Sequence, residues 1–174
     1  MKTMKKTVAL MTMLAIFFML TACTSHGSVR VISNGSEHTA LEHWNHGFSP
    51  RMNASGWAKT AEDIADELSP FPLEDDFQII VEGPIWENSV YYYFYQLVDG
   101  EWELALVVYI QDDLKRVYLT HESAWEREKW EEVEAESLFD LLTPGEYVLD
   151  VGVWWGNSRT ANSYQNFFRM IKQP

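Results

Sequence analysis

The chain is poor in cysteine, in basic residues and in long apolar runs. Cys23 is the one cysteine among 174 residues, so no disulfide can form within the chain. Lys and Arg number 13 against 26 Asp and Glu, and this acidic balance disfavours nucleic acid as a partner. The apolar run from Val8 to Ala22 is shorter than the roughly 20 residues of a membrane-spanning helix. Because no disulfide can form, the domain must be held together by its core alone.

Motifs for catalysis are also missing. The chain has no Gly-x-Ser-x-Gly nucleophile elbow, no glycine-rich phosphate loop and no His-Glu-x-x-His zinc helix. Carboxylates do cluster, at Asp75-Asp76, at Glu101 with Glu103, and at Asp112-Asp113. Glycoside hydrolysis depends on the separation of two such groups across a cleft, which a sequence does not give. We therefore predict a non-catalytic protein without a cofactor and keep a carboxylate-dependent glycosidase as an alternative.

The first 22 residues have the organisation of a secretory signal peptide, with three lysines before a short apolar core. The four residues that end at the cysteine, Leu20-Thr21-Ala22-Cys23, resemble the lipobox of bacterial lipoproteins. The resemblance implies that residues 1–22 are removed and that Cys23, as the first mature residue, carries a diacylglyceryl group. Two or more acyl chains would anchor the protein stably to the outer face of the bacterial cytoplasmic membrane. An ordinary cleaved signal peptide is the alternative.

The mature chain is long enough for one domain with a sizeable core. Residues 23–28 are expected to form the lipidated cysteine and a short tether, and residues 29–174 a single domain. Because the leader carries three of the basic residues and none of the acidic ones, ten basic side chains remain against 26 acidic ones. This charge argues against a second, electrostatic contact with anionic lipid.

The mature sequence reads as mainly β. Asn34-Gly35 predicts a hairpin over residues 29–41, and the capping-box pattern of Thr60 and Asp63 predicts a short helix over 61–68. Period-two patterns predict further strands, which lie at residues 77–81, 90–98, 101–110, 114–119, 147–155 and 164–171. In the strand at 101–110 we expect one core-facing side, which comprises Trp102, Leu104, Leu106, Val108 and Ile110. Seven or eight strands with one short helix predict an antiparallel sandwich or barrel.

The segment Leu142-Thr143-Pro144-Gly145-Glu146-Tyr147 resembles the late corner of bacterial immunoglobulin-like sandwich domains. The resemblance covers about 30 residues, and it implies that the Tyr147 hydroxyl bonds back to the backbone of that corner. It makes an immunoglobulin-like β-sandwich the expected fold. The mature chain also resembles uncharacterised surface lipoproteins of Gram-positive gut bacteria, in Asp63-Ile64-Ala65-Asp66-Glu67-Leu68, Asp75-Asp76-Phe77 and Pro144-Gly145-Glu146-Tyr147. That second resemblance implies no activity.

Aromatic residues supply the candidate binding surface. Adjacent strand residues point to opposite faces, so Trp154 and Trp155 cannot both enter one core, and neither can the whole run from Tyr91 to Tyr95. Exposed rings can stack on a sugar or anchor a protein interface. We predict a binding module for a glycan or a protein, with ligand-binding candidates Trp154, Tyr92, Trp125 and Trp130. In the alternative, other segments cover these rings.

Three histidines offer a weaker, metal-holding or solute-presenting alternative. His38, His43 and His46 lie close in sequence, but a zinc site needs three or four ligands brought to one point, and exposed loop histidines are the simpler interpretation. The acid-rich run 122–136 predicts either a helix or an irregular crossover. It lacks the spacing of a calcium loop.

Overall fold

The computed structural model describes residues 27–45, 59–83, 85–111, 116–121, 130–133, 138–155 and 162–174. The predicted leader, Cys23, His46 and Trp125 lie outside these ranges. Each helix within them is too short and too polar to span a bilayer.

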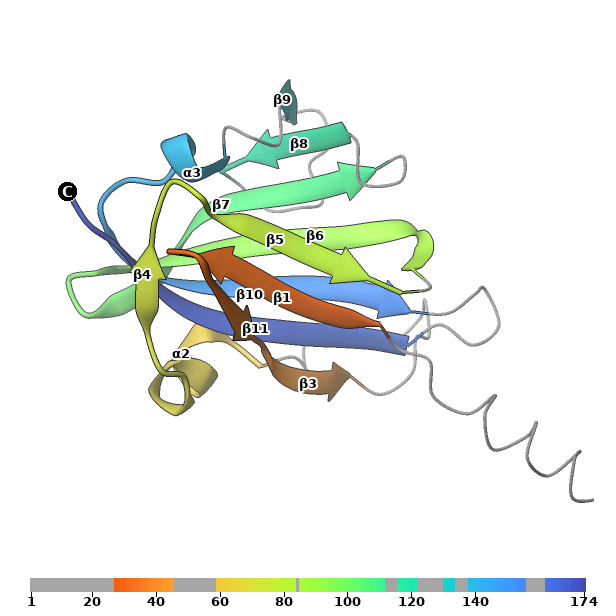
Figure 1. Ribbon diagram of the computed structural model, residues 1–174, viewed down its shortest axis with the longest axis horizontal. Helices are drawn as coiled ribbons and strands as arrows, with labels where there is room; N and C mark the ends of the chain where they lie inside the picture. Colours follow the sequence, from red (N-terminus) through yellow and green to blue (C-terminus); the bar gives the residue numbers. More distant parts are fainter. Residues whose placement is uncertain are drawn as a thin grey trace, which may run out of the picture.

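The described residues form two sheets, and the smaller one lies in front of the larger one in Figure 1. The strand order of the smaller sheet is β2 (Ser36–Thr39), β1 (Ser28–Ser33), β5 (Gln78–Glu82). The order of the larger sheet is β3 (Leu41–Asn45), β11 (Asn162–Lys172), β10 (Gly145–Trp155), β6 (Ile85–Val98), β7 (Glu101–Gln111), β8 (Arg116–Thr120), β9 (Glu131–Val133). All these pairs are antiparallel, whereas β4 (Phe71–Leu73) pairs in parallel with β11. The predicted mainly β, antiparallel sandwich is confirmed.

Turn chemistry explains both predicted hairpins. Asn34 and Gly35 have φ of 54° and 64°, the left-handed conformation that a two-residue hairpin turn requires. Asp76 fixes this turn from outside, because its two carboxylate oxygens accept hydrogen bonds from the backbone N–H groups of Asn34 and Gly35 at 2.6 and 2.7 Å. Between β6 and β7, Asp99 and Gly100 adopt φ of 51° and 91° in the same way.

The predicted helix over 61–68 forms as a short α-helix, α2 (Ala61–Ile64), followed by the 3₁₀ turn η2 (Ala65–Glu67). The capping box is present in full. The Thr60 hydroxyl accepts from the Asp63 N–H, and the Asp63 carboxylate accepts from the Thr60 N–H. A second short α-helix, α3 (Leu138–Leu141), was not predicted.

Two apolar clusters stabilise the fold, one on each face of the larger sheet. The core cluster fills the space between the sheets; its fully buried members include Val31, Phe94, Tyr147, Leu149 and Met170. The second cluster lies on the outer face of the larger sheet, where α2 and η2 cover it; its buried members are Ala61, Ile64, Ala65, Val148 and Phe167. The helix therefore protects one end of a face that would otherwise be open.

The prediction of one core-facing side for β7 is wrong at its beginning. Phe94 pairs with Leu106 and Tyr95 with Leu104, so Ala105 is an extra residue, a β-bulge. Leu106, Val108 and Ile110 enter the core cluster as expected, whereas Trp102 packs against the second cluster on the opposite face. One inserted residue reverses the face of every residue before it.

The number of elements also differs from the prediction. Eleven strands and two short α-helices occur within the described residues, against the expected seven or eight strands and one helix. The additional strands are short, and two of them, β4 and β9, have only three residues. Strand β9 lies inside the acid-rich run, where a helix or an irregular crossover was expected. Three residues are too few to show a period-two pattern.

Candidate functional site

A row of aromatic rings crosses three neighbouring strands on the outer face of the larger sheet and ends beside a fourth. We call it the tyrosine ladder; its members are Tyr91 and Tyr93 of β6, Tyr109 of β7, Tyr118 of β8 and Trp130, which precedes β9. Their position follows from register. Tyr91 lies opposite Tyr109, and Tyr109 lies opposite Tyr118, while the residues on either side of each ring enter the core cluster. Strand alternation thus brings the rings together.

The rings pack on one another. The centroids of Tyr91 and Tyr109 are 4.8 Å apart and their planes differ by 23°, a stacked arrangement. Tyr118 stacks on Tyr109 from the next strand at 6.4 Å, and Trp130 meets the same ring edge-on at 5.9 Å. Tyr109 therefore has three aromatic neighbours and is the centre of the ladder. All five rings are half-buried.

A buried carboxylic acid lies at the end of the ladder. Asp150 of β10 is opposite Tyr93 in register and only 5% exposed. One of its oxygens accepts a hydrogen bond of 2.7 Å from the Gln165 side chain; the other has no hydrogen-bond partner in the part of the chain that the structure describes. Burial raises the pKa of Asp150 to about 7, because the charged form loses its hydration.

The same environment affects the neighbouring phenols. Burial raises the pKa of Tyr93 well above its usual value, and the negative charge of Asp150 adds to the effect. Burial, again with Asp150, raises the pKa of Tyr95 to about 12. Both hydroxyls therefore stay protonated at neutral pH and do not serve as bases.

The structure separates the predicted aromatic candidates. Trp130 belongs to the ladder, and its indole N–H is buried without a partner among the described residues. Tyr92 is 3% exposed and lies in the core cluster, so its prediction as an exposed ligand-binding ring is corrected. The backbone of Trp154 lies in β10 beside a register shift; its side chain and the whole of Trp125 lie outside the described residues.

The described histidines lie on different sheets. His38, on β2, stacks on Phe71 with ring centroids 3.7 Å apart. His43 lies on β3 at the edge of the larger sheet, opposite Gln165. Within the described ranges, no three His, Cys, Asp or Glu side chains are grouped so as to hold a metal ion.

Of the carboxylates that the sequence indicated, Asp76 caps the first hairpin turn and Asp112 and Asp113 lie outside the described residues. Glu101 borders a hollow of about 560 Å³ next to α2, together with Glu62, Asp66 and Trp102. Arg169 also lines this hollow. Its charge is engaged elsewhere, because its guanidinium forms an ion pair with Glu146 and donates to the Ala65 carbonyl.

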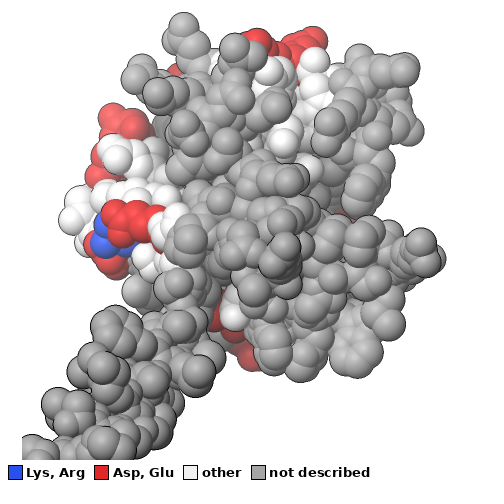
Figure 2. Space-filling view, turned by 90° about the vertical axis from the view of Figure 1, so that its right-hand side faces the viewer, with Lys and Arg blue, Asp and Glu red and all other residues white. Residues whose placement is uncertain are grey.

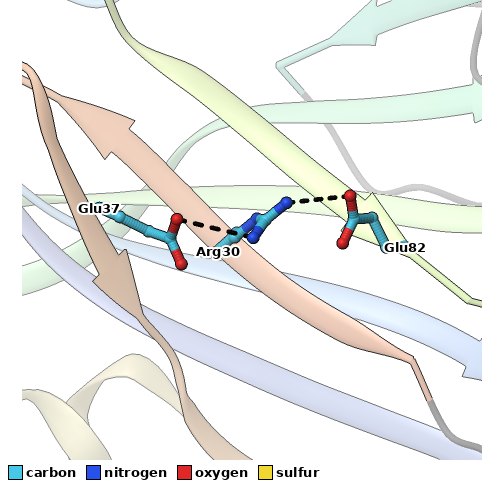
Figure 3. Close-up of polar contacts among 3 residues, drawn as sticks. All are labelled: Arg30, Glu37 and Glu82. Carbon is cyan, nitrogen blue, oxygen red and sulfur yellow. Dashed lines mark hydrogen bonds and ion pairs between the residues drawn. The ribbon is translucent and has the colours of Figure 1, made fainter.

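Charge on the smaller sheet is arranged around one cation. Figure 3 shows Arg30 between Glu37 and Glu82, on the three strands of that sheet, with N···O distances of 3.6 and 2.9 Å. On the side of the molecule in Figure 2, the described charged groups are mainly acidic. Arg30 is thus shared by two carboxylates and leaves a net negative charge there.

Sequence reasoning missed four ladder tyrosines and Asp150. The run from Tyr91 to Tyr95 had indicated that some rings face outward, but not which. The sequence does contain a signal that Tyr109 and Tyr118 face outward, since each lies between two core residues of its strand. Asp150 had one as well, because a carboxylate between Leu149 and Val151 must lie on the other face.

No protein-family model matches this chain, and no curated protein or solved structure matches it either.

Proposed function

We propose that this protein is a lipid-anchored extracytoplasmic module that binds a protein partner through the tyrosine ladder. The observation that carries the proposal is the packing of Tyr91, Tyr109 and Tyr118 into one continuous row across three strands. Tyrosine gives a large contact area with few rotatable bonds and a polar tip, and it is enriched at protein interfaces for that reason. A row fixed by the sheet loses little entropy on binding.

The anchor in this proposal depends on the first 23 residues. Their basic start, short apolar core and lipobox-like Leu20-Thr21-Ala22-Cys23 support lipidation at Cys23. The described domain begins at residue 27, only four residues beyond that cysteine. A lipidated Cys23 would hold the domain close to the membrane surface, where its partner is a membrane or cell-envelope protein.

Ring orientation favours a protein over a saccharide. A sugar stacks on an open aromatic face, but the central ring, Tyr109, is stacked on Tyr91 and Tyr118. The ladder therefore offers ring edges and hydroxyl groups, which suit a flat, partly polar protein surface. A saccharide remains the second ligand class to test, and the glycosidase alternative is tested by incubating the protein with cell-wall and dietary glycans.

The test is co-isolation of cross-linked partners from membranes with matched variants. Tyr109→Ala removes the central ring and should abolish recovery of the partner, whereas Tyr109→Phe keeps the stack and should retain most of it. Tyr164→Ala serves as the control, because Tyr164 is half-buried and packs against the core cluster on the other face of the sheet. Equal recovery with all three variants would refute the proposal.

A further inference from the structure

Among the described residues, one edge of the smaller sheet has no pairing strand. Strand β5 is the last strand in the order β2-β1-β5, and no described strand pairs with its other edge. It pairs with β1 in five successive positions without a bulge, so its free edge is regular as well. Such an edge presents a row of N–H and C=O groups that a further strand can bind.

An apolar groove runs beside this edge. Its volume is about 440 Å³, and it lies between β5, the inner face of β6 to β8, and α3. Tyr92, Ile110 and Val117 line it from the larger sheet, and Ile79 faces it from β5. In Figure 1 the smaller sheet crosses only part of the larger one, and β7 to β9 extend beyond it. A strand added to β5 would extend the smaller sheet toward β7 and β8.

The edge lacks the usual protection against strand addition. Natural proteins block exposed edges with proline, an inward-pointing charge or a bulge. Strand β5 reads Gln78-Ile79-Ile80-Val81-Glu82, with neither proline nor lysine. Ile79 and Val81 pack with the core cluster, and Ile80, between them, also borders the groove.

The charged residues beside the groove indicate what kind of segment would bind in it. Asp75 and Asp76 border the groove at the start of β5, and no Lys or Arg is among the described residues that line it. At the other end of the strand, Glu82 shares Arg30 with Glu37. The groove thus combines an apolar floor with one acidic end, at Asp75 and Asp76.

We infer that this groove binds an extended peptide segment of a partner protein, which adds to β5 as a fourth strand. The segment carries apolar side chains at alternate positions, which enter the groove beside Ile79 and Phe139, and a Lys or Arg that reaches the exposed Asp75. Backbone hydrogen bonds to β5 supply affinity, and the alternate side chains supply specificity. This site lies between the sheets, apart from the tyrosine ladder on the outer face, so either proposal can fail without the other.

The test uses full-length protein purified in detergent and a short synthetic peptide of alternating valine and threonine with a lysine at each end. Binding is measured by titration, and hydrogen exchange of the β5 amides is followed with and without peptide. We expect slower exchange at Gln78 to Glu82, and at least about tenfold weaker binding when the backbone amides of the peptide are N-methylated. Equal binding of the methylated peptide, or unchanged exchange at β5, would overturn the inference.

Two lysine variants on the smaller sheet complete the test. Ile79→Lys places a positive charge in the groove and should abolish peptide binding. Ser36→Lys, the control, adds the same charge at an exposed position of β2, on the opposite edge of the smaller sheet, and should leave binding within about threefold. If Ile79→Lys does not fold, the methylated peptide still decides the result with the native sequence. A dimer that Ile79→Lys dissociates would identify a second copy of the chain as the occupant and overturn the peptide proposal.

Discussion

The Tyr147 hydroxyl donates a hydrogen bond of 2.8 Å to the carbonyl oxygen of Thr143. The ring is only 1% exposed, and the bond closes the turn that leads into β10. This is the corner contact that the resemblance to immunoglobulin-like sandwich domains implied, and the structure confirms it. The same strand β10 carries Asp150 to the end of the tyrosine ladder, so the corner positions part of the candidate site.

Tyr147→Phe should lower the free energy of unfolding by about 1–2 kcal/mol, because it removes the two hydrogen bonds of the hydroxyl, to the carbonyl and to the side chain of Thr143, and keeps the buried ring. Urea unfolding of the purified variant measures the change. Tyr92→Phe is the control, since Tyr92 is also buried in the core cluster and lies outside the corner. An unchanged unfolding midpoint for Tyr147→Phe would show that the corner bond contributes nothing to stability.

Asp150→Asn should remove a pH dependence of stability. Burial raises the pKa of Asp150 from 3.8 to about 7, so between these values the folded protein keeps a proton that the unfolded chain releases. Stability due to this group is therefore complete below about pH 4 and is lost as the pH rises toward 7, by at most about 1.4 kcal/mol per pH unit. An asparagine cannot ionise, so the variant should be more stable than the native protein at pH 8.

Unfolding in urea at several pH values between 4 and 8 tests this prediction. The control is Asp75→Asn, which makes the same substitution at an exposed carboxylate. Parallel slopes for the native protein and Asp150→Asn would mean that Asp150 is ionised in the folded state, and the prediction would be wrong.

Deletion of Ala105 should destabilise the protein by about 3 kcal/mol or more. Without the bulge, the residues of β7 before position 105 turn to the other face, and Trp102 leaves the second cluster. Ala105→Ser keeps the extra residue and should have a much smaller effect. Thermal unfolding of both variants provides the comparison, and similar losses in the two would show that the bulge does not set the face of Trp102.

Cys23→Ser should release the protein from the membrane fraction, because a serine cannot receive the thioether-linked lipid. Fractionation of cells that express the native and variant chains gives the answer. Retention of Cys23→Ser in membranes would mean that the uncleaved leader or a protein contact holds it there.

Local chemistry made much of the fold predictable. Asn34-Gly35, Asp99-Gly100 and the Thr60 capping box each indicate their structure within a few residues, and each formed as expected. The bulge at Ala105 has no such signal, because the pattern from Trp102 to Ile110 alternates without interruption in the sequence. Its position follows from pairing with β6, a contact between distant parts of the chain.

The site was less predictable than the fold for the same reason. The alternation of residues along β6 predicted that some aromatic rings face outward. Which of these rings contact one another depends on the order of the strands in the sheet. Tyr92 and Tyr91 are neighbours in sequence, yet one lies in the core cluster and the other stacks on Tyr109. The choice between them depends on which face of the sheet the smaller sheet covers, and the local sequence does not contain that information.

Photo-cross-linking in living cells tests the central claim most directly. A photoreactive phenylalanine analogue replaces Tyr118 at the ladder in one variant and Glu37, on the smaller sheet, in another. We expect a discrete protein adduct from position 118, its loss when Tyr109→Ala is added, and no adduct of the same size from position 37. No protein adduct at position 118, together with a saccharide that stabilises the native protein but not Tyr109→Ala, would contradict the claim and make the ladder a glycan-binding surface.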